Sequence, residues 1–85
     1  MLLNSIDEWF VYFDNNRKQI CKFIKMHSPN KLNDLIEARD NNDYFLMFKI
    51  IQDIWLEVPL NNININKDLE GWQQLNVLLN NILYK

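Results

Sequence analysis

The feature that most constrains the fold is the segment of residues 44–56, in which ten of thirteen residues are apolar. A helix that is apolar around most of its circumference is stable only when protein surrounds it. We therefore expect a helix over about residues 43–57 at the centre of a small domain. Asp43 would supply its N-cap, and Pro59 would end it because proline cannot continue a helix.

The N-terminal part of the chain predicts another helix. Ser5 and Glu8 have the spacing of a capping box, in which two side chains satisfy backbone amides of the first turn. Apolar residues then recur at steps of four, three and seven, as they do on one helix face. These residues are Ile6, Phe10, Phe13, Ile20 and Ile24. We expect one helix over about residues 5–26, and the polar run at residues 14–16 leaves open whether it is kinked.

A third helix is predicted after a boundary at Ser28 and Pro29. Ser28 is suited to the N-cap and Pro29 to the first helical position, where its missing amide costs nothing. A short apolar stripe follows, made of Leu32, Leu35 and Ile36. The helix should cover about residues 29–40.

The last predicted helix follows an Asn-rich loop over residues 60–67. It covers about residues 69–83 and begins at Asp68 or Asn66 as its cap. Its apolar face consists of Leu69, Trp72, Leu75, Leu79 and Ile82, with Leu78 beside them. Four helices with short connections predict an all-α fold, a compact bundle of four helices.

The size and composition of the chain predict one globular domain over residues 1–85, because 48% of its residues are hydrophobic. The single Cys21 excludes an internal disulfide. The sequence shows no secretory leader and no apolar stretch long enough to span a membrane. We therefore expect a cytoplasmic protein.

The residue types on which most enzymes depend are scarce. The only cysteine and the only histidine, Cys21 and His27, lie on one predicted helix and are separated by about 240° of rotation, so they do not form a catalytic pair. Zinc sites require three or four ligands at short spacing. The only glycine, Gly71, excludes a glycine-rich phosphate loop. We expect no catalysis, no cofactor, no metal and no small-molecule substrate.

The charges are segregated along the chain. Residues 15–33 carry a formal charge of +5, and residues 34–70 carry −5. Three basic residues, Lys18, Lys22 and Lys25, fall on one face of the first predicted helix, which is a pattern found in nucleic-acid-binding proteins. However, a pI near 5.2 gives little electrostatic attraction for phosphates, so binding to nucleic acid is disfavoured.

The acidic residues predict a protein-binding surface. On the third predicted helix, Asp34, Glu37 and Asp40 form a ridge opposite the apolar stripe. Aromatic residues contribute strongly to protein interfaces, although in a chain this small most of them belong to the core. The aromatic candidates are Tyr12, Tyr44, Trp55, Trp72 and Tyr84. The complete predicted partner-binding set is Asp34, Glu37, Asp40, Asp43, Tyr44, Asp53 and Glu57.

Three segments, residues 35–45, 51–59 and 71–75, carry a family resemblance. Their pattern is a short helix, a helix that ends in Trp55 and then Pro59, a loop, and Gly71-Trp72 at the start of the last helix. This pattern resembles small all-helical immunity proteins of bacterial contact-dependent growth-inhibition and polymorphic toxin systems. Many of those proteins carry cysteines after the Gly-Trp pair, and this chain does not.

The resemblance implies a protein that binds one cognate toxin, such as a nuclease domain, and occludes its active site or substrate path. It transfers a structural framework and no binding residues. An alternative from another class is a phage-encoded inhibitor of a host defence system, of the anti-CRISPR type. A third hypothesis is a small nucleic-acid-associated regulator that uses Arg17, Lys18, Lys22 and Lys25.

Overall fold

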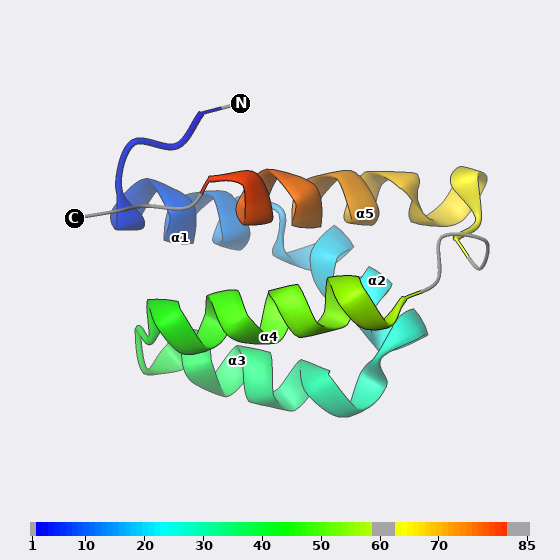
Figure 1. The fold of residues 1–85 in the computed structure, drawn as a ribbon, viewed down its shortest axis with the longest axis horizontal. Coiled ribbons are helices and arrows are strands. Elements are labelled where there is room, and N and C mark those ends of the chain that lie inside the picture. Colours follow the sequence, from blue (N-terminus) through cyan, green and yellow to red (C-terminus); the bar gives the residue numbers. More distant parts are fainter. Residues whose placement is uncertain (1, 59–62, 82–85) are drawn as a thin grey trace.

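The computed structural model describes residues 2–58 and 63–81 of the 85-residue chain. Within these residues there is no β-strand, so the all-α prediction is confirmed (Figure 1). The helices are α1 (Ile6–Asn15), α2 (Arg17–His27), the short 3₁₀ helix η1 (Pro29–Lys31), α3 (Leu32–Asp40), α4 (Tyr44–Glu57) and α5 (Ile65–Asn80). The radius of gyration of 12.1 Å is close to the value of about 12 Å for a compact chain of this length.

The helices pack around one hydrophobic core. The α3 and α4 helices form an antiparallel pair, and α5 runs antiparallel to α4 on its other side (Figure 1). The α2 helix packs against α5, and α1 contacts both of them. The buried apolar residues are Leu3, Trp9, Phe10, Phe13, Ile20, Phe23, Ile24, Leu35, Ala38, Tyr44, Met47, Ile51, Ile54, Leu75 and Leu78.

The single helix that we predicted over residues 5–26 is two helices, separated at Asn16. The backbone of Asn16 leaves the helical region, with φ −113° and ψ 13°. Its side-chain amide donates to the carbonyl of Tyr12 at 2.8 Å, and its Oδ1 accepts from Nε2 of Gln74 in α5 at 3.2 Å. A short polar side chain thus competes for backbone hydrogen bonds, and a contact with another helix fixes the break.

Ser5 caps α1 and Asp43 caps α4, as predicted, but the side chain of Glu8 accepts from the amide of Asn4 at 2.9 Å, so the capping box forms only in part. The backbone amide of Glu8 donates to Oγ of Ser5, and that of Leu46 donates to Oδ1 of Asp43, each at 3.1 Å. Ser28 makes no side-chain cap hydrogen bond, and the predicted helix over residues 29–40 begins with the η1 turn, so its α-helical part is shorter than predicted.

The prediction that α4 lies at the centre of the domain is wrong. One face of α4 is buried, whereas Phe45 is 81% exposed and Leu56 67% exposed on the opposite side. The α4 helix lies between α3 and α5 (Figure 1). No described residue covers the side of α4 that carries Phe45 and Leu56. The α4 helix therefore carries more apolar residues than the core accommodates.

The α5 helix begins at Ile65, four residues earlier than predicted, so part of the predicted loop is helical. Its cap is Asn64, whose side chain accepts from the amide of Asn66 at 2.9 Å. The buried face of α5 is also rotated from the prediction, because Leu69 is 39% exposed while Leu75 and Leu78 are fully buried. The predicted positions 60–62 and 82–83 lie outside the described residues.

Gly71 lies where α5 packs tightly against α2. A Cβ atom at this position would lie 2.7 Å from Cβ of Phe23 and 3.0 Å from the carbonyl oxygen of Gln19. The absence of a side chain at Gly71 allows the two helices to come this close.

Candidate protein-binding surface

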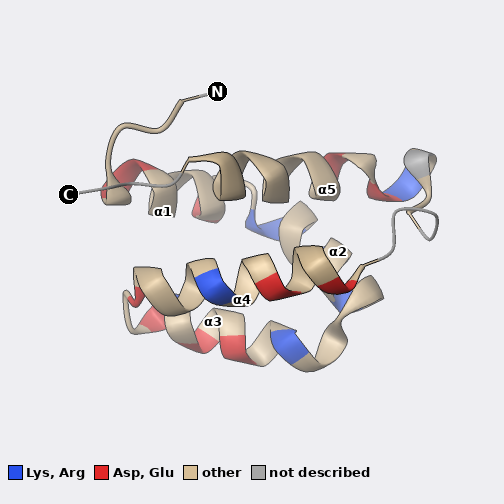
Figure 2. Ribbon diagram, in the orientation of Figure 1, with Lys and Arg blue, Asp and Glu red and all other residues tan. Residues whose placement is uncertain are grey.

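The acidic ridge of α3 is exposed to solvent, as predicted. Asp34, Glu37 and Asp40 are exposed, while Leu35 and Ala38 face the core. Figure 2 shows acidic residues on both α3 and α4. The alternation of exposed acids with buried small or apolar residues follows from the helical period.

Two cations near the ridge are paired with acids outside it. The guanidinium of Arg39 donates from Nε to Oδ1 of Asp14 at 3.0 Å and from Nη2 to Oδ2 at 2.8 Å. These hydrogen bonds from Arg39 lower the pKa of Asp14. In the same way, Nζ of Lys31 lies 3.1 Å from Oε1 of Glu57. Among the ion pairs of the described residues, none uses an acid of the α3 ridge.

The remaining predicted acids have different environments. Asp43 is exposed at the α3–α4 turn, next to the ridge, but its carboxylate also caps α4. Asp53 is partly buried on α4. Glu57 is exposed but already bound to Lys31. Asp43 therefore adds a carboxylate beside the ridge. The carboxylate of Glu57 is not available in the same way, because Lys31 already binds it.

Tyr44 belongs to the core and not to the exposed surface where we predicted it. It is 7% exposed, and its ring packs edge-on against Trp9 with the ring centroids 4.8 Å apart. Its hydroxyl is buried and has no hydrogen-bond partner among the described residues. The next residue, Phe45, is exposed instead, because adjacent residues of a helix point about 100° apart.

The aromatic candidates also differ in exposure. Trp55 is 39% exposed, and Tyr12 and Trp72 are partly buried, whereas Tyr84 lies outside the described residues. Sequence reasoning did not single out Trp9, which is fully buried and donates from Nε1 to the carbonyl of Leu78 at 2.9 Å. Its position three residues after Ile6 and directly before Phe10, within the predicted apolar stripe, was the available signal.

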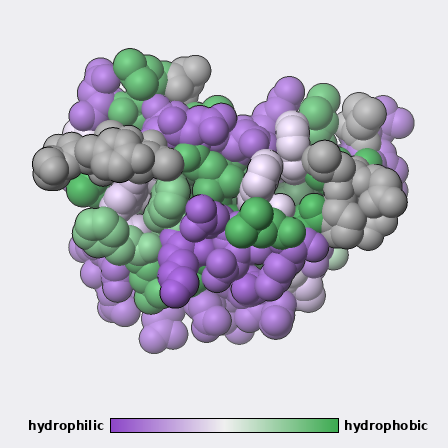
Figure 3. All heavy atoms as spheres, in the orientation of Figure 1, coloured by the Kyte–Doolittle hydropathy of each residue, from purple (hydrophilic) through white to green (hydrophobic). Residues whose placement is uncertain are grey.

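An apolar hollow lies between α4 and α5. It has a volume of about 170 Å³ and is lined by Phe48, Trp55, Leu56 and Leu79 together with the amide residues Gln52, Asn76 and Asn80. Figure 3 shows hydrophobic residues on this face of the molecule among hydrophilic ones.

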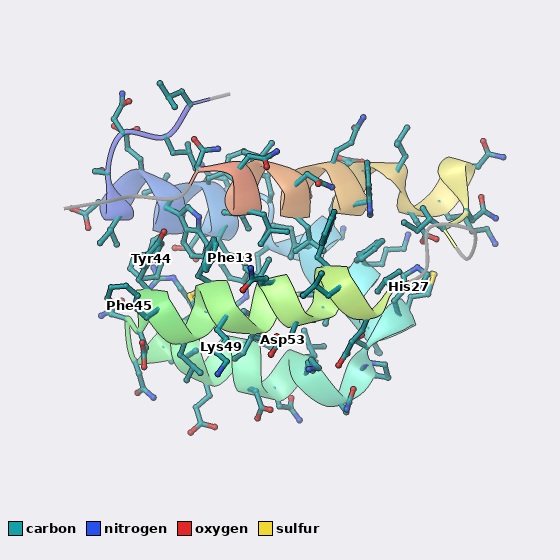
Figure 4. The ribbon with its side chains drawn as sticks, viewed as in Figure 1. Phe13, His27, Tyr44, Phe45, Lys49 and Asp53 are labelled. Atoms are coloured by element: carbon teal, nitrogen blue, oxygen red, sulfur yellow. The ribbon has the colours of Figure 1, made fainter. Side chains whose placement is uncertain are left out.

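His27 and Asp68 form a polar contact that the sequence analysis did not predict. The Nε2–H of His27 donates to Oδ2 of Asp68 at 3.1 Å, and the same oxygen accepts the backbone amide of Asn64 at 2.8 Å. Burial opposes ionisation of Asp68, but hydrogen bonds from Asn64 and His27 and the charges of His27 and Lys67 outweigh it and lower the pKa of Asp68. In Figure 4, His27 lies near the start of α5.

The described residues show little that suggests reactive chemistry. Cys21 is partly buried, and burial raises the pKa of its thiol, against the opposing effect of Arg17, so the reactive thiolate is disfavoured. No group of three or more His, Cys, Asp or Glu side chains within residues 2–58 and 63–81 is placed to hold a metal ion. In the same residues, no helix has the length and apolar character needed to cross a membrane.

Comparison with protein-family models, with curated proteins and with solved structures finds no match to this chain. The similarity to immunity proteins therefore stays a prediction from three segments of sequence.

Proposed function

We propose that this protein is an immunity protein that binds a cognate toxin domain, such as a nuclease, and occludes its active site or substrate path. The observation that carries the proposal is the surface formed by Asp34, Glu37, Asp40 and Asp43. All four are exposed and take no part in an ion pair of the described residues. We call these four residues the acidic surface.

Charge complementarity supports this choice of partner. Nucleases bind phosphates with basic residues, and a group of exposed carboxylates is attracted to the same residues. Complementary charge also accelerates association and disfavours wrong partners. Arg39 and Lys31 offset the acidic surface only in part, because their ion-pair partners are Asp14 and Glu57, although the charge of Asp40 also acts on Arg39.

The experiment is a charge reversal that leaves the helix cap in place. We expect Glu37→Lys with Asp40→Lys to abolish capture of the toxin from a lysate of the native host and to abolish protection of cells that express the toxin. Asp43 is left unchanged, because its carboxylate caps α4 and its reversal would also destabilise the helix.

The matched control reverses two exposed acids elsewhere, Asp7→Lys with Glu70→Lys. The control has the same net charge as the test variant and should keep both capture and protection. Circular dichroism would show that both variants are folded. If the reversed acidic surface still protects cells, the assignment of this surface is wrong.

A second candidate function rests on α2, where Lys18, Lys22 and Lys25 are exposed. None of the three is in an ion pair of the described residues. A regulator that binds nucleic acid would retain a short duplex at about 50 mM salt and release it as salt rises. An unchanged fluorescence anisotropy of a labelled duplex under these conditions would exclude this candidate.

A further inference from the structure

The exposed side of α4 carries a regular line of four residues. Phe45, Lys49, Gln52 and Leu56 are all exposed and follow each other at steps of four, three and four. Because an α-helix has 3.6 residues per turn, these positions lie along one side of α4, and about 16 Å separates the first from the last. We call these four residues the α4 seam.

The spacing of the α4 seam is that of the contact positions in a two-stranded coiled coil, where apolar residues alternate at steps of three and four. In the seam the two end positions are apolar and the two middle positions are polar. The order is also symmetric, because Phe45 and Leu56 lie equally far from the midpoint of the seam, as do Lys49 and Gln52.

We propose that α4 pairs in antiparallel orientation with α4 of a second copy of this chain, across a two-fold axis. In this pairing Phe45 of each copy packs on Leu56 of the other, so the two most exposed apolar residues of the helix cover each other. Lys49 of each copy lies against Gln52 of the other copy and beside its Asp53. A two-fold interface requires this reciprocal form of contact.

The charges on α4 select this orientation. A parallel pairing would place Lys49 against Lys49 of the second copy, and like charges at an interface are unfavourable. Lys49 and Asp53 are in no ion pair of the described part of the chain, so both charges are available to the second copy. Figure 4 shows the two side chains leaving the same side of α4. Polar residues at such positions fix the register of paired helices.

The length of the helix limits the strength of the pairing. The α4 helix has 14 residues and is about 21 Å long, so the contact is smaller than the roughly 1,600 Å² of a standard interface. We therefore expect a weak dimer that forms at high protein concentration.

Sedimentation equilibrium of the full chain, from about 10 µM to about 1 mM, tests the proposal in the range where weak complexes dissociate. We expect a monomer–dimer equilibrium in this range. Phe45→Glu with Leu56→Glu should weaken the dimer at least tenfold. The matched control is Leu2→Glu with Val11→Glu, which replaces two exposed apolar residues away from α4 and should leave the dimer unchanged.

A charge exchange tests the orientation. Lys49→Glu places acids against Asp53 of the second copy, and Asp53→Lys places lysines against its Lys49, so each single change should weaken the dimer. The double variant restores opposite charges and should restore the affinity. A monomer throughout the range, a dimer that survives the changes at Phe45 and Leu56, or a double variant no better than the single ones would overturn the proposal.

Discussion

Oδ2 of Asp68 lies 3.1 Å from Nε2 of His27 and 2.8 Å from the backbone nitrogen of Asn64. Asp68 is 3% exposed, so this carboxylate joins the end of α2 to the start of α5 inside the protein. A buried carboxylate is stable only when hydrogen bonds replace the water that it has lost. Both of these partners supply one.

We predict that Asp68→Ala lowers the free energy of unfolding by about 2 kcal/mol, because it removes a charged acceptor and leaves the amide of Asn64 without its side-chain partner. Urea denaturation would measure the change. The control is Asp34→Ala, an exposed acid without an ion pair in the described residues, which should change stability by less than about 0.5 kcal/mol. Equal losses in the two variants would contradict a stabilising role for the buried carboxylate.

The lowered pKa of Asp68 predicts how stability depends on pH. Folding holds this pKa below its ordinary value near 3.8, so the stabilisation is fully present above that value and is lost as pH falls through the folded pKa. We expect the free energy of unfolding to fall below about pH 4. Asp68→Asn should show a smaller acid-induced loss, because it has no carboxylate to protonate. Parallel curves for the two proteins would show that Asp68 does not contribute to the pH dependence.

Gly71→Ala should destabilise the protein, although alanine is the better helix former by about 1 kcal/mol. The new methyl group would meet Cβ of Phe23 at 2.7 Å and the backbone oxygen of Gln19 at 3.0 Å, so α2 and α5 would have to move apart. We expect a net loss of about 1 to 3 kcal/mol in chemical denaturation. Gln73→Ala, at an exposed position of the same helix, is the control and should be nearly neutral. A stabilised Gly71→Ala variant would disprove the close helix contact.

Tyr44→Phe should maintain or raise stability by up to about 1 kcal/mol, because it removes a buried hydroxyl that no described residue hydrogen-bonds and keeps the ring against Trp9. Thermal unfolding would measure the effect. Tyr44→Ala is the comparison, and the cavity that it leaves should cost about 3 kcal/mol or more. A loss of stability in the phenylalanine variant would reveal a partner for the hydroxyl.

The sequence predicts those parts of the fold that local chemistry determines. Asp43 caps α4 where expected, because an aspartate before an apolar helical run satisfies the first amides without help from the rest of the chain. The exposure of Asp34, Glu37 and Asp40 also followed from helical period.

The errors occur where contacts between distant residues decide the structure. The break at Asn16 depends on Gln74, which is 58 residues away. The early start of α5 depends on Asn64 together with Asp68, which is itself held by His27. An Asn-rich segment offers several possible caps, and only a tertiary contact selects one. The assignment of Tyr44 to the surface failed for a similar reason, because the direction in which α4 faces is set by its neighbours.

The hydrogen bond from Trp9 to the carbonyl of Leu78 has a consequence for biosynthesis. The indole N–H of Trp9 in α1 has its acceptor only after α5 has been synthesised. The α2 helix also packs against α5, so its apolar face is covered at the same late stage. While the chain emerges from the ribosome, the apolar faces of the first two helices therefore remain open to solvent and to chaperones. Cooperative folding should begin only after translation has passed residue 78.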